Sequence, residues 1–339
     1  MSALYSLIAV LLLLGCGLLA GRVEGLYLAA GIAVPYTAAA IFLAGICYRV
    51  VRWARTPVPF RIPTTCGQQK SLPWIDYAKL ENPASTVAAI GRMALEILCF
   101  RSLFRNTRTE VSRNRAVIGE NKFLWLGAIA FHYALLLVLL RHLRLFLEPV
   151  PAWVLSLQKA DGFFQVGAPE WYLSDVVLLA GLAYLLARRL RDPLLRYISL
   201  FTDYFALFLI SGIALTGILM RYFTKTDVAG VKQFALGLAT FSPSAPKGVG
   251  PLFFAHLLLV CVLAAYFPFS KLMHMGGIFL SPTRNLANTS RTRRHINEWN
   301  YPVKTHSYAE WEEEFKDKMV AAGIPLETEH ARTAIANRT

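Results

Sequence analysis

Long apolar blocks alternate with polar and basic segments along this chain. A helix needs about 20 apolar residues to cross roughly 30 Å of hydrocarbon, because every backbone polar group in lipid must bond within its own segment. Blocks that meet this requirement are Leu4–Ala20, Leu26–Val50, Phe123–Phe146, Tyr172–Leu186, Phe201–Met220 and Leu252–Phe269. The pattern therefore predicts an all-α integral membrane protein, a helical bundle of about six transmembrane helices.

Basic residues gather at the ends of alternate blocks. The clusters are Arg49, Arg52 and Arg55 after the second block, Arg188, Arg189, Arg191 and Arg196 after the fourth, and Lys271, Arg291, Arg293 and Arg294 after the sixth. Loops rich in Lys and Arg stay on the cytoplasmic side, so we expect a multi-pass protein of the cytoplasmic membrane with both termini in the cytoplasm. This placement accounts for much of the net charge of +14 and argues against nucleic-acid binding. The outer side then holds Arg141, Arg144, Arg221 and Lys232, which need another explanation.

The polar segments divide the chain into four parts. Residues 1–50 hold two N-terminal transmembrane helices, 51–121 form a basic, Pro-rich cytoplasmic segment, 122–280 form the histidine-bearing bundle, and 281–339 form a cytoplasmic tail. Since no Lys or Arg precedes the first block, we interpret it as a retained anchor and not as a signal peptide.

Two amphipathic helices are predicted outside the spans. Apolar residues at helical spacing over Pro83–Phe104 predict a helix that either lies in the inner membrane interface or is a buried connector. Glu, Lys and aromatic residues over Tyr308–Ala322 predict a second helix, which either docks on a partner or is a solvated charged helix.

Four of the seven histidines lie in or beside two of the blocks: His132 and His142 in the third, and His256 and His274 in or just after the sixth. An ionisable side chain inside a bilayer is costly and indicates a functional site. The charge-derived topology makes these two helices antiparallel, so His142 and His256 lie toward the outer surface and His132 and His274 lie further inward. One imidazole from each helix at two depths is what two haems between the helices need.

The histidine spacings differ between the two helices. At 1.5 Å per residue, the pair in the third block is about 15 Å apart and the pair in the sixth about 27 Å apart. With straight helices, the histidines of both pairs could not lie at matching depths. We therefore predict that Pro268 kinks the sixth helix and shortens its rise. Asp203, near a span end, is predicted to be a helix cap or a partner of the basic loop.

An alternative from another class remains open. The histidines would then tie neighbouring helices together in a haem-free membrane anchor or transporter.

The cysteines support neither a zinc site nor a protein-bound iron–sulfur cluster, because they are scattered without a CxxC pair. They are Cys16, Cys47, Cys66, Cys99 and Cys261.

The histidine-bearing stretches resemble a known family. From about Phe123 to Arg284 the chain looks like the haem-b gamma subunit of respiratory nitrate reductase. The stretches that carry the resemblance are AFHYALLLVLLRHLR and FFAHLLLVCVLAAYFPFSKLMH, whose ligand spacings of ten and eighteen match the family. The extra N-terminal span, the segment RIPTTCGQQKSLPW around Cys66 and the long tail are similar to the DsrM branch, the membrane subunit associated with dissimilatory sulfite reductase.

The resemblance implies a di-haem cytochrome b with two haem b groups and a quinone, either menaquinone or ubiquinone. His142 with His256 would ligate the outer haem iron, and His132 with His274 the inner one. Candidates for contact with quinone or for pairing with haem propionates near the outer haem are Arg141, Arg144, Lys159, Asp161 and Arg221.

The same resemblance implies partners. Electrons would pass between the quinone pool and a cytoplasmic iron–sulfur subunit that resembles heterodisulfide reductase, a DsrK-like protein. The chain would be one subunit of a sulfite or sulfur-metabolism respiratory complex that contains other membrane and periplasmic redox subunits. The axial ligands do not set the direction of electron flow, because they leave the haem potentials widely open.

Overall fold

The structure is a computed structural model, and it describes residues 1–56, 67–105, 107–112, 115–164, 169–244, 248–292 and 305–327. It divides into two units, Met1–Arg293 and Arg294–Thr339, and each is described by itself. Cys66 lies outside the described residues.

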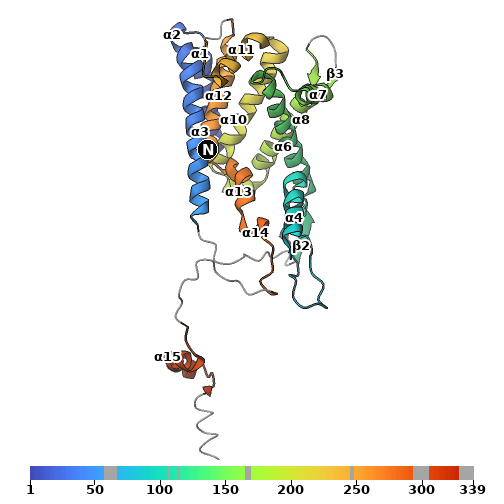
Figure 1. Ribbon diagram of the computed structural model, residues 1–339, viewed down its shortest axis with the longest axis vertical. Helices are drawn as coiled ribbons and strands as arrows, with labels where there is room; N and C mark the ends of the chain where they lie inside the picture. Colours follow the sequence, from blue (N-terminus) through green and yellow to red (C-terminus); the bar gives the residue numbers. More distant parts are fainter. Residues whose placement is uncertain are drawn as a thin grey trace, which may run out of the picture. The chain divides into compact units, whose positions relative to one another are not determined.

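Long helices run side by side through the first unit (Figure 1). They are α1 (Ser2–Ala20), α3 (Val34–Ala54), α6 (Lys122–His142), α8 (Leu173–Arg191), α10 (Phe201–Ile218) and α12 (Pro251–Tyr266). The segments long and apolar enough to span a membrane are Ser2–Ala20, Ala29–Ala54, Lys122–Leu145, Phe201–Phe223 and Pro251–Phe269. The predicted all-α membrane bundle is confirmed, and the chain is a multi-pass membrane protein.

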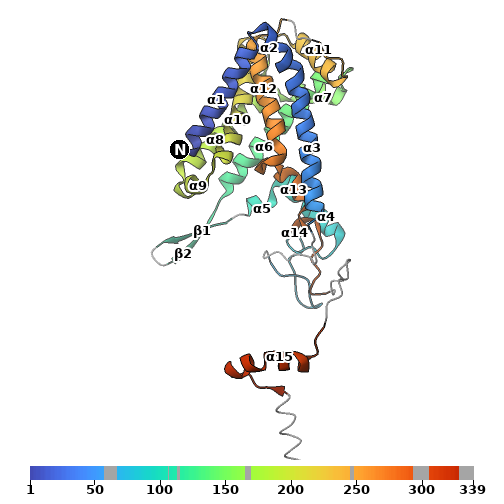
Figure 2. The ribbon, with the colours of Figure 1, turned by 90° about the vertical axis from the view of Figure 1, so that its left-hand side faces the viewer.

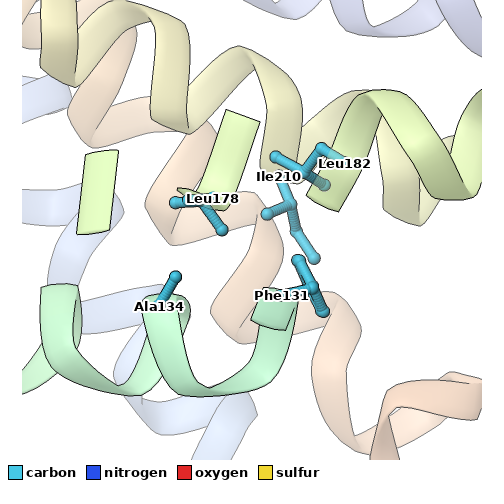
Figure 3. Packing of buried hydrophobic residues seen from close by; sticks show 5 residues of the cluster. All are labelled: Phe131, Ala134, Leu178, Leu182 and Ile210. Carbon is cyan, nitrogen blue, oxygen red and sulfur yellow. The ribbon is translucent and has the colours of Figure 1, made fainter. Parts of the chain in front are cut away.

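The helix α8 differs from the other predicted spans. It has 19 residues, but Asp175 lies in its first turn and arginines, among them Arg188, fill its last turn, so its apolar stretch is short. It is nevertheless part of the bundle, because Leu178 and Leu182 belong to a buried cluster with Phe131 of α6 (Figure 3). Five of the six predicted spans therefore have the length and apolarity of a membrane span, and α8 is a bundle helix with charged ends.

The two long helices that carry histidines, α6 and α12, pack mainly on different neighbours and not on each other. α6 packs on α8, whereas α12 packs on α1, α3 and α10 (Figure 2). The contact between α1 and α12 is close, since a Cβ added at Gly17 would lie 2.4 Å from the Cα of Ala255. Ser6 of α1 also donates a hydrogen bond to the carbonyl of Phe201 at 2.8 Å. The first apolar block is thus built into the bundle.

The last span is interrupted where a kink was predicted. α12 ends at Tyr266, and a 3-10 turn (Phe267–Phe269) containing Pro268 follows. Extended backbone at Ser270 and a second 3-10 turn (Lys271–Met273) separate it from α13 (His274–Leu280). Proline lacks the N–H that would continue the helix. The interruption at Pro268 is therefore a complete break, and His256 and His274 lie on different helices.

Short elements connect the long helices. The helical ones are α2 (Glu24–Leu28), a π-helix (Ala29–Ala33), α4 (Thr86–Cys99), α5 (Arg101–Phe104), a 3-10 turn (Leu143–Leu145), α7 (Ala152–Asp161), α9 (Pro193–Ile198), a π-helix (Leu219–Phe223), α11 (Val228–Ala239) and α14 (Pro282–Asn285). The strands form two antiparallel pairs, β1 (Thr107–Ser112) with β2 (Arg115–Glu120) and β3 (Gly162–Phe164) with β4 (Trp171–Tyr172).

The amphipathic helix α4 turns its polar face inward. Val87 is 80% exposed, and Ile90 and Leu98 on the same face are also exposed. Arg92 is buried on the opposite face and donates to the carbonyl of Glu81 at 2.7 Å. An exposed apolar stripe beside apolar spans is typical of a helix in the membrane interface. The choice between the two predicted alternatives, an interfacial helix and a buried connector, stays a prediction.

The C-terminal tail divides between the two units. Asn288 is buried and donates through its backbone N–H to the carbonyl of Pro83 at 2.6 Å, so residues up to 292 pack on the first unit. In the second unit α15 (Tyr308–Ala321) begins with a capping box, in which Ser307 and Glu310 satisfy each other's backbone N–H groups. The predicted second amphipathic helix is confirmed, and its role in docking stays a prediction.

Candidate functional site

The structure brings His132 and His274 together, although they lie on α6 and at the start of α13. Their ring centres are 6.0 Å apart, with the ring planes at 86°. Nδ1 of His132 donates to the carbonyl of Ala128 at 2.7 Å, and Nδ1 of His274 donates to the carbonyl of Lys271 at 2.8 Å. Because a carbonyl only accepts, each neutral ring carries its proton on Nδ1, and Nε2 keeps its lone pair.

His142 and His256 form a second pair near the opposite ends of α6 and α12. The two rings are near enough for a charge on His142 to act on His256. Nδ1 of His142 donates to the carbonyl of Val138 at 2.7 Å. Nδ1 of His256 lies 2.9 Å from the hydroxyl of Thr216, which itself donates to the carbonyl of Gly212 at 2.7 Å. The hydroxyl proton is thus committed to the backbone, so Thr216 accepts from His256 and again leaves Nε2 as the lone-pair nitrogen.

This donor set fits haem iron. An imidazole nitrogen lies about 2 Å from the metal it binds, so two rings on one ion have centres roughly 6 Å apart, and the ring centres of His132 and His274 have this separation. A hydrogen bond that holds Nδ1 and presents Nε2 is the usual support of a metal-binding histidine. Among the described residues no three His, Cys, Asp or Glu side chains gather as a metal site.

A buried ion network lies beside His142. Arg141 at the end of α6 is only 8% exposed, and its Nε lies 2.9 Å from Oδ2 of Asp161. Its NH2 group lies 2.9 Å from Oδ1 of Asp175 and 2.8 Å from the hydroxyl of Ser174. The backbone N–H and the hydroxyl of Ser174 also donate to Asp161, at 2.8 and 2.7 Å. The carboxylates of α7 and α8 therefore close around one guanidinium.

An aromatic ring continues this network to the π-helix that follows α10. Tyr172 is buried between two guanidinium groups, with Cζ of Arg141 3.8 Å and Cζ of Arg221 4.0 Å from its ring centre. Tyr222 donates to Oδ2 of Asp175 at 2.8 Å. Two arginines and two aspartates give the network a formal charge of zero. A buried charged network of this kind is costly to break, because loss of one member leaves a desolvated charge.

The basic residues on the predicted outer side thus have local partners. Besides the two arginines of the network, Arg144 donates to Gln158 at 2.7 Å and Lys232 forms an ion pair with Glu148. Among the described residues Lys159 is exposed with no recorded partner. Of the predicted quinone or propionate candidates, the structure joins Arg141 and Asp161, places Arg221 beside them, and leaves Arg144 and Lys159 nearby on the 3-10 turn after α6 and on α7.

An open, mostly apolar groove of about 380 Å³ lies between α6, α7 and α8. Tyr133, Leu137 and Leu140 of α6 line one side, and Val177 of α8 lines the other. Asp161 of α7 lies at the groove as well. The groove therefore combines a long apolar lining with the buried ion network.

Several residues around the histidines were missed at the level of sequence. Thr216 and the pair Tyr172 and Tyr222 gave no pattern, since a single hydroxyl in an apolar helix is common. Asp175 carried a usable signal, because a carboxylate near a span end can pair with Arg141 at the end of the neighbouring span. Asp203 is as predicted: it caps α10 at the N–H of Leu200 and pairs with Lys271 at 2.7 Å.

These features define a class, the multi-pass helical membrane proteins whose bundle carries two pairs of histidines. The chain belongs to the nitrate reductase gamma subunit family, which matches residues 92–293, more than half of its length. The chain is also 46% identical to the Hdr-like menaquinol oxidoreductase cytochrome b-like subunit of Archaeoglobus fulgidus, over 79% of this chain and 82% of that protein. The subunit of the same name from Archaeoglobus profundus is 43% identical, over 79% and 81%.

Proposed function

We propose that this chain is a cytochrome b subunit that passes electrons between membrane menaquinol and a cytoplasmic iron–sulfur subunit. His142 and His256 would hold one haem b at the outer side, and His132 and His274 a second haem b at the inner side. The observation that carries the proposal is the set of four imidazoles in two pairs, each with Nδ1 bonded to an oxygen. The two relatives are named as menaquinol oxidoreductase subunits, which supports the choice of quinone.

The protein's part is ligation and environment. When bound, the haem irons would supply one-electron redox chemistry. The Nδ1–H bonds to Ala128, Val138, Thr216 and Lys271 fix the orientation of each ring and raise the basicity of Nε2. The apolar cluster of α6, α8 and α10 keeps water out of the space beside these rings.

We place the quinone site at the outer end of α6, in the groove between α6, α7 and α8. Its apolar lining suits an isoprenoid tail, and the ion-paired Asp161 lies at the groove where the ring would sit. Lys159 and Arg144 are the further candidates for contact with the quinone ring. Arg141 and Arg221 are better explained as members of the ion network, because their guanidinium groups already face Asp161, Asp175 and Tyr172.

The partner would dock on the basic inner face. Arg188, Arg189, Arg191 and Arg196 lie at the predicted cytoplasmic ends of α8 and α9. The relatives are named as Hdr-like, which is consistent with a partner that resembles heterodisulfide reductase. With the DsrM-like features of the tail, we infer a respiratory complex of sulfur metabolism with a DsrK-like subunit.

Haem content tests the proposal. We expect a pyridine haemochrome assay on the purified chain to give two haems b per chain, with a b-type α-band in the dithionite-reduced spectrum. A folded preparation without haem would instead support a haem-free anchor whose histidines tie helices, as His256 and Thr216 do.

Single replacements test the pairing. His142→Ala and His256→Ala should each remove the same haem and leave the other, whereas His132→Ala and His274→Ala should remove the remaining one. His306 lies outside both pairs, so His306→Ala is the matched control and should keep two haems. Removal of one haem by His142→Ala and of the other by His256→Ala would contradict the pairing.

Truncation tests the docking surface. Because residues up to 292 pack on the first unit, the informative truncation removes only residues 294–339. We expect this variant to keep both haems and to lose the iron–sulfur subunit on purification. Co-purification at the parental ratio would exclude the tail from the docking surface.

A further inference from the structure

The junction between α4 and α5 has an unusual backbone. Phe100 lies between the two helices, as the C-cap of α4 and the N-cap of α5, with φ 49° and ψ 44° in the left-handed region. A bulky residue there is an outlier, because its Cβ crowds the carbonyl and glycine is favoured. Such strain persists only where the surroundings hold it, and it gathers at functional sites. A phenylalanine at a position that suits glycine therefore indicates that its ring has a role.

That role follows from the contacts of the Phe100 ring. Its centre is 5.0 Å from the centre of the His132 ring, with the planes at 86°. Phe131 contacts the same imidazole edge-on at 4.9 Å, and His274 faces it at 6.0 Å. Edge-to-face packing restricts rotation about the bond that carries a ring. Two phenylalanines and the Nδ1 bond to Ala128 thus define the plane of His132.

The junction of α4 and α5 around Phe100 forms an elbow. Hydrogen bonds from side chains of α6 hold this elbow against α6. Tyr133 donates to the carbonyl of Leu98 at 2.8 Å, and Nε1 of Trp125 donates to the carbonyl of Cys99 at 2.8 Å. These carbonyls belong to the last turn of α4, where no intrahelical partner remains. Beside apolar spans an unsatisfied carbonyl is costly, so these bonds fix the elbow at the level of His132.

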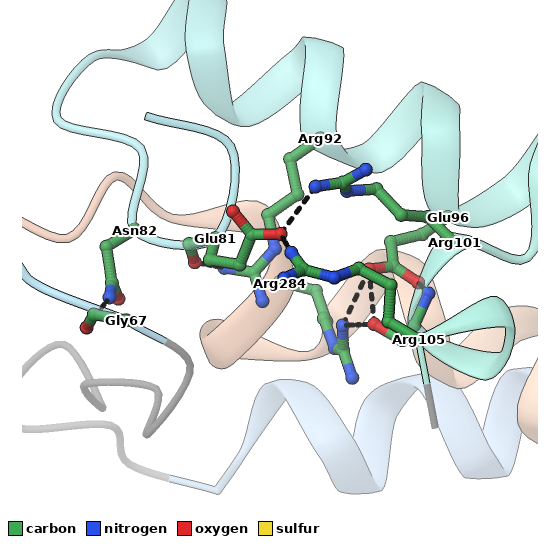
Figure 4. A network of polar contacts seen from close by, with 9 residues as sticks. Gly67, Glu81, Asn82, Arg92, Glu96, Arg101, Arg105 and Arg284 are labelled. Carbon is green, nitrogen blue, oxygen red and sulfur yellow. Dashed lines mark hydrogen bonds and ion pairs between the residues drawn. The ribbon is translucent and has the colours of Figure 1, made fainter. Parts of the chain in front are cut away.

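The elbow is also tied to the segment that follows His274. The carboxylate of Glu96 accepts from the backbone N–H of Ser102 at 3.0 Å and from Arg284 at 2.9 Å (Figure 4). Arg284 lies on α14, directly after α13, the helix that begins with His274. It also donates to the hydroxyl of Ser102. One polar cluster therefore joins the segments that carry or cover both histidines of the pair.

We propose that the α4–α5 elbow is part of the inner haem site, with Phe100 as a positioning residue that sets the plane of the His132 imidazole. The Glu96–Ser102–Arg284 cluster holds the elbow and the His274 segment in one arrangement. This inference rests on the proposed function, because it requires haem between His132 and His274.

Replacement of Phe100 by glycine tests the contribution of the ring separately from that of the backbone conformation. Phe100→Gly suits the left-handed backbone and keeps the elbow, while it removes the ring. We expect two haems per chain, a changed low-spin electron paramagnetic resonance signal and reduction potential of the inner haem, and an unchanged outer haem. The His142→Ala and His132→Ala variants, each with one haem, assign the two signals.

Matched variants complete the test. Phe100→Tyr keeps an aromatic ring and should show the parental signal. Val87→Ala, at the exposed start of α4 and away from the elbow, should leave that signal unchanged. Where Phe100→Gly does not accumulate, Phe100→Leu is measured, with the same expected change. Parental signals for both haems in the variant without the ring would overturn the proposal and leave the proposed function standing. A parental chain without haem would remove both.

Discussion

At the Arg141 end of the bundle, His142 and His256 stand on two continuous helices beside a closed ion network of Arg141, Asp161 and Asp175. At the Phe100 end, His132 still stands on α6, but His274 follows a broken helix and is approached by an elbow and a polar cluster. The first end is set by the packing of helices. The second is set by connecting segments, which fold on the bundle from outside.

The two ends should therefore differ in rigidity: the Arg141 end is rigid, and the Phe100 end can adjust. Helix packing and buried charges fix the first pair within the bundle, so changes there should threaten the whole fold. Connecting segments have fewer buried contacts, and local structure of this kind opens at lower cost than a core helix. The end that would face a cytoplasmic partner is thus the one built from segments able to adjust.

The largest effect should come from Arg141→Ala at the first end. It leaves Asp161 and Asp175 buried without their counter-charge, which costs about 3–5 kcal/mol. We expect loss of most folded protein in detergent, measured by size-exclusion chromatography and thermal unfolding. Arg144→Ala removes one hydrogen bond to Gln158 and serves as the control. Equal stability of the two variants would show that the network contributes nothing to the fold.

A smaller effect is expected for Gly17→Val, which tests the support of α12. Its Cβ would meet the backbone of Ala255, so α1 or α12 must shift, at about 3 kcal/mol. The shift should change the spectrum of the haem proposed at His256 more than the spectrum of the other haem. Gly15→Val is the matched control, because a Cβ at Gly15 meets nothing within 4 Å. A larger spectral change at the His274 end would contradict the comparison.

Arg284→Ala tests the second end. It removes the partner of Glu96 and Ser102, at about 2 kcal/mol. We expect faster proteolysis of the elbow while the rest of the bundle keeps its parental unfolding temperature. Arg291→Ala, at an exposed arginine in the segment that follows α14, should change neither quantity. Global destabilisation as large as that of Arg141→Ala would mean that both ends are equally part of the core.

The smallest effect should come from Thr216→Val. It removes the acceptor for Nδ1 of His256, at about 1 kcal/mol. We expect weaker retention of one haem in a haem-transfer assay with apomyoglobin. Thr216→Ser keeps the hydroxyl and should behave as the parent. Ser211→Ala removes a hydroxyl that bonds only its own helix, to Leu207, and should have no effect on haem retention.

Much of the bundle could be predicted from the sequence, because apolar length and histidine spacing are local properties. The spans, the amphipathic helices and the interruption at Pro268 all follow from periodicity or from proline chemistry. The ion network could not be predicted, since pairing Arg141 with Asp161 and Asp175 depends on which helices are neighbours. The elbow was hidden for a similar reason, because nothing near Phe100 in the chain indicates a left-handed turn against His132.

The close contact of Gly17 with Ala255 has a consequence for biogenesis. α1 leaves the ribosome well before its tight neighbour α12, because the long helices α3, α6, α8 and α10 lie between them in the chain. The surface of α1 around Gly17 therefore stays without this neighbour in the bilayer until α12 has been inserted. Final closure of the bundle is in this sense a late event, and a chain that stalls before Pro251 would leave that surface open to lipids or to insertion factors.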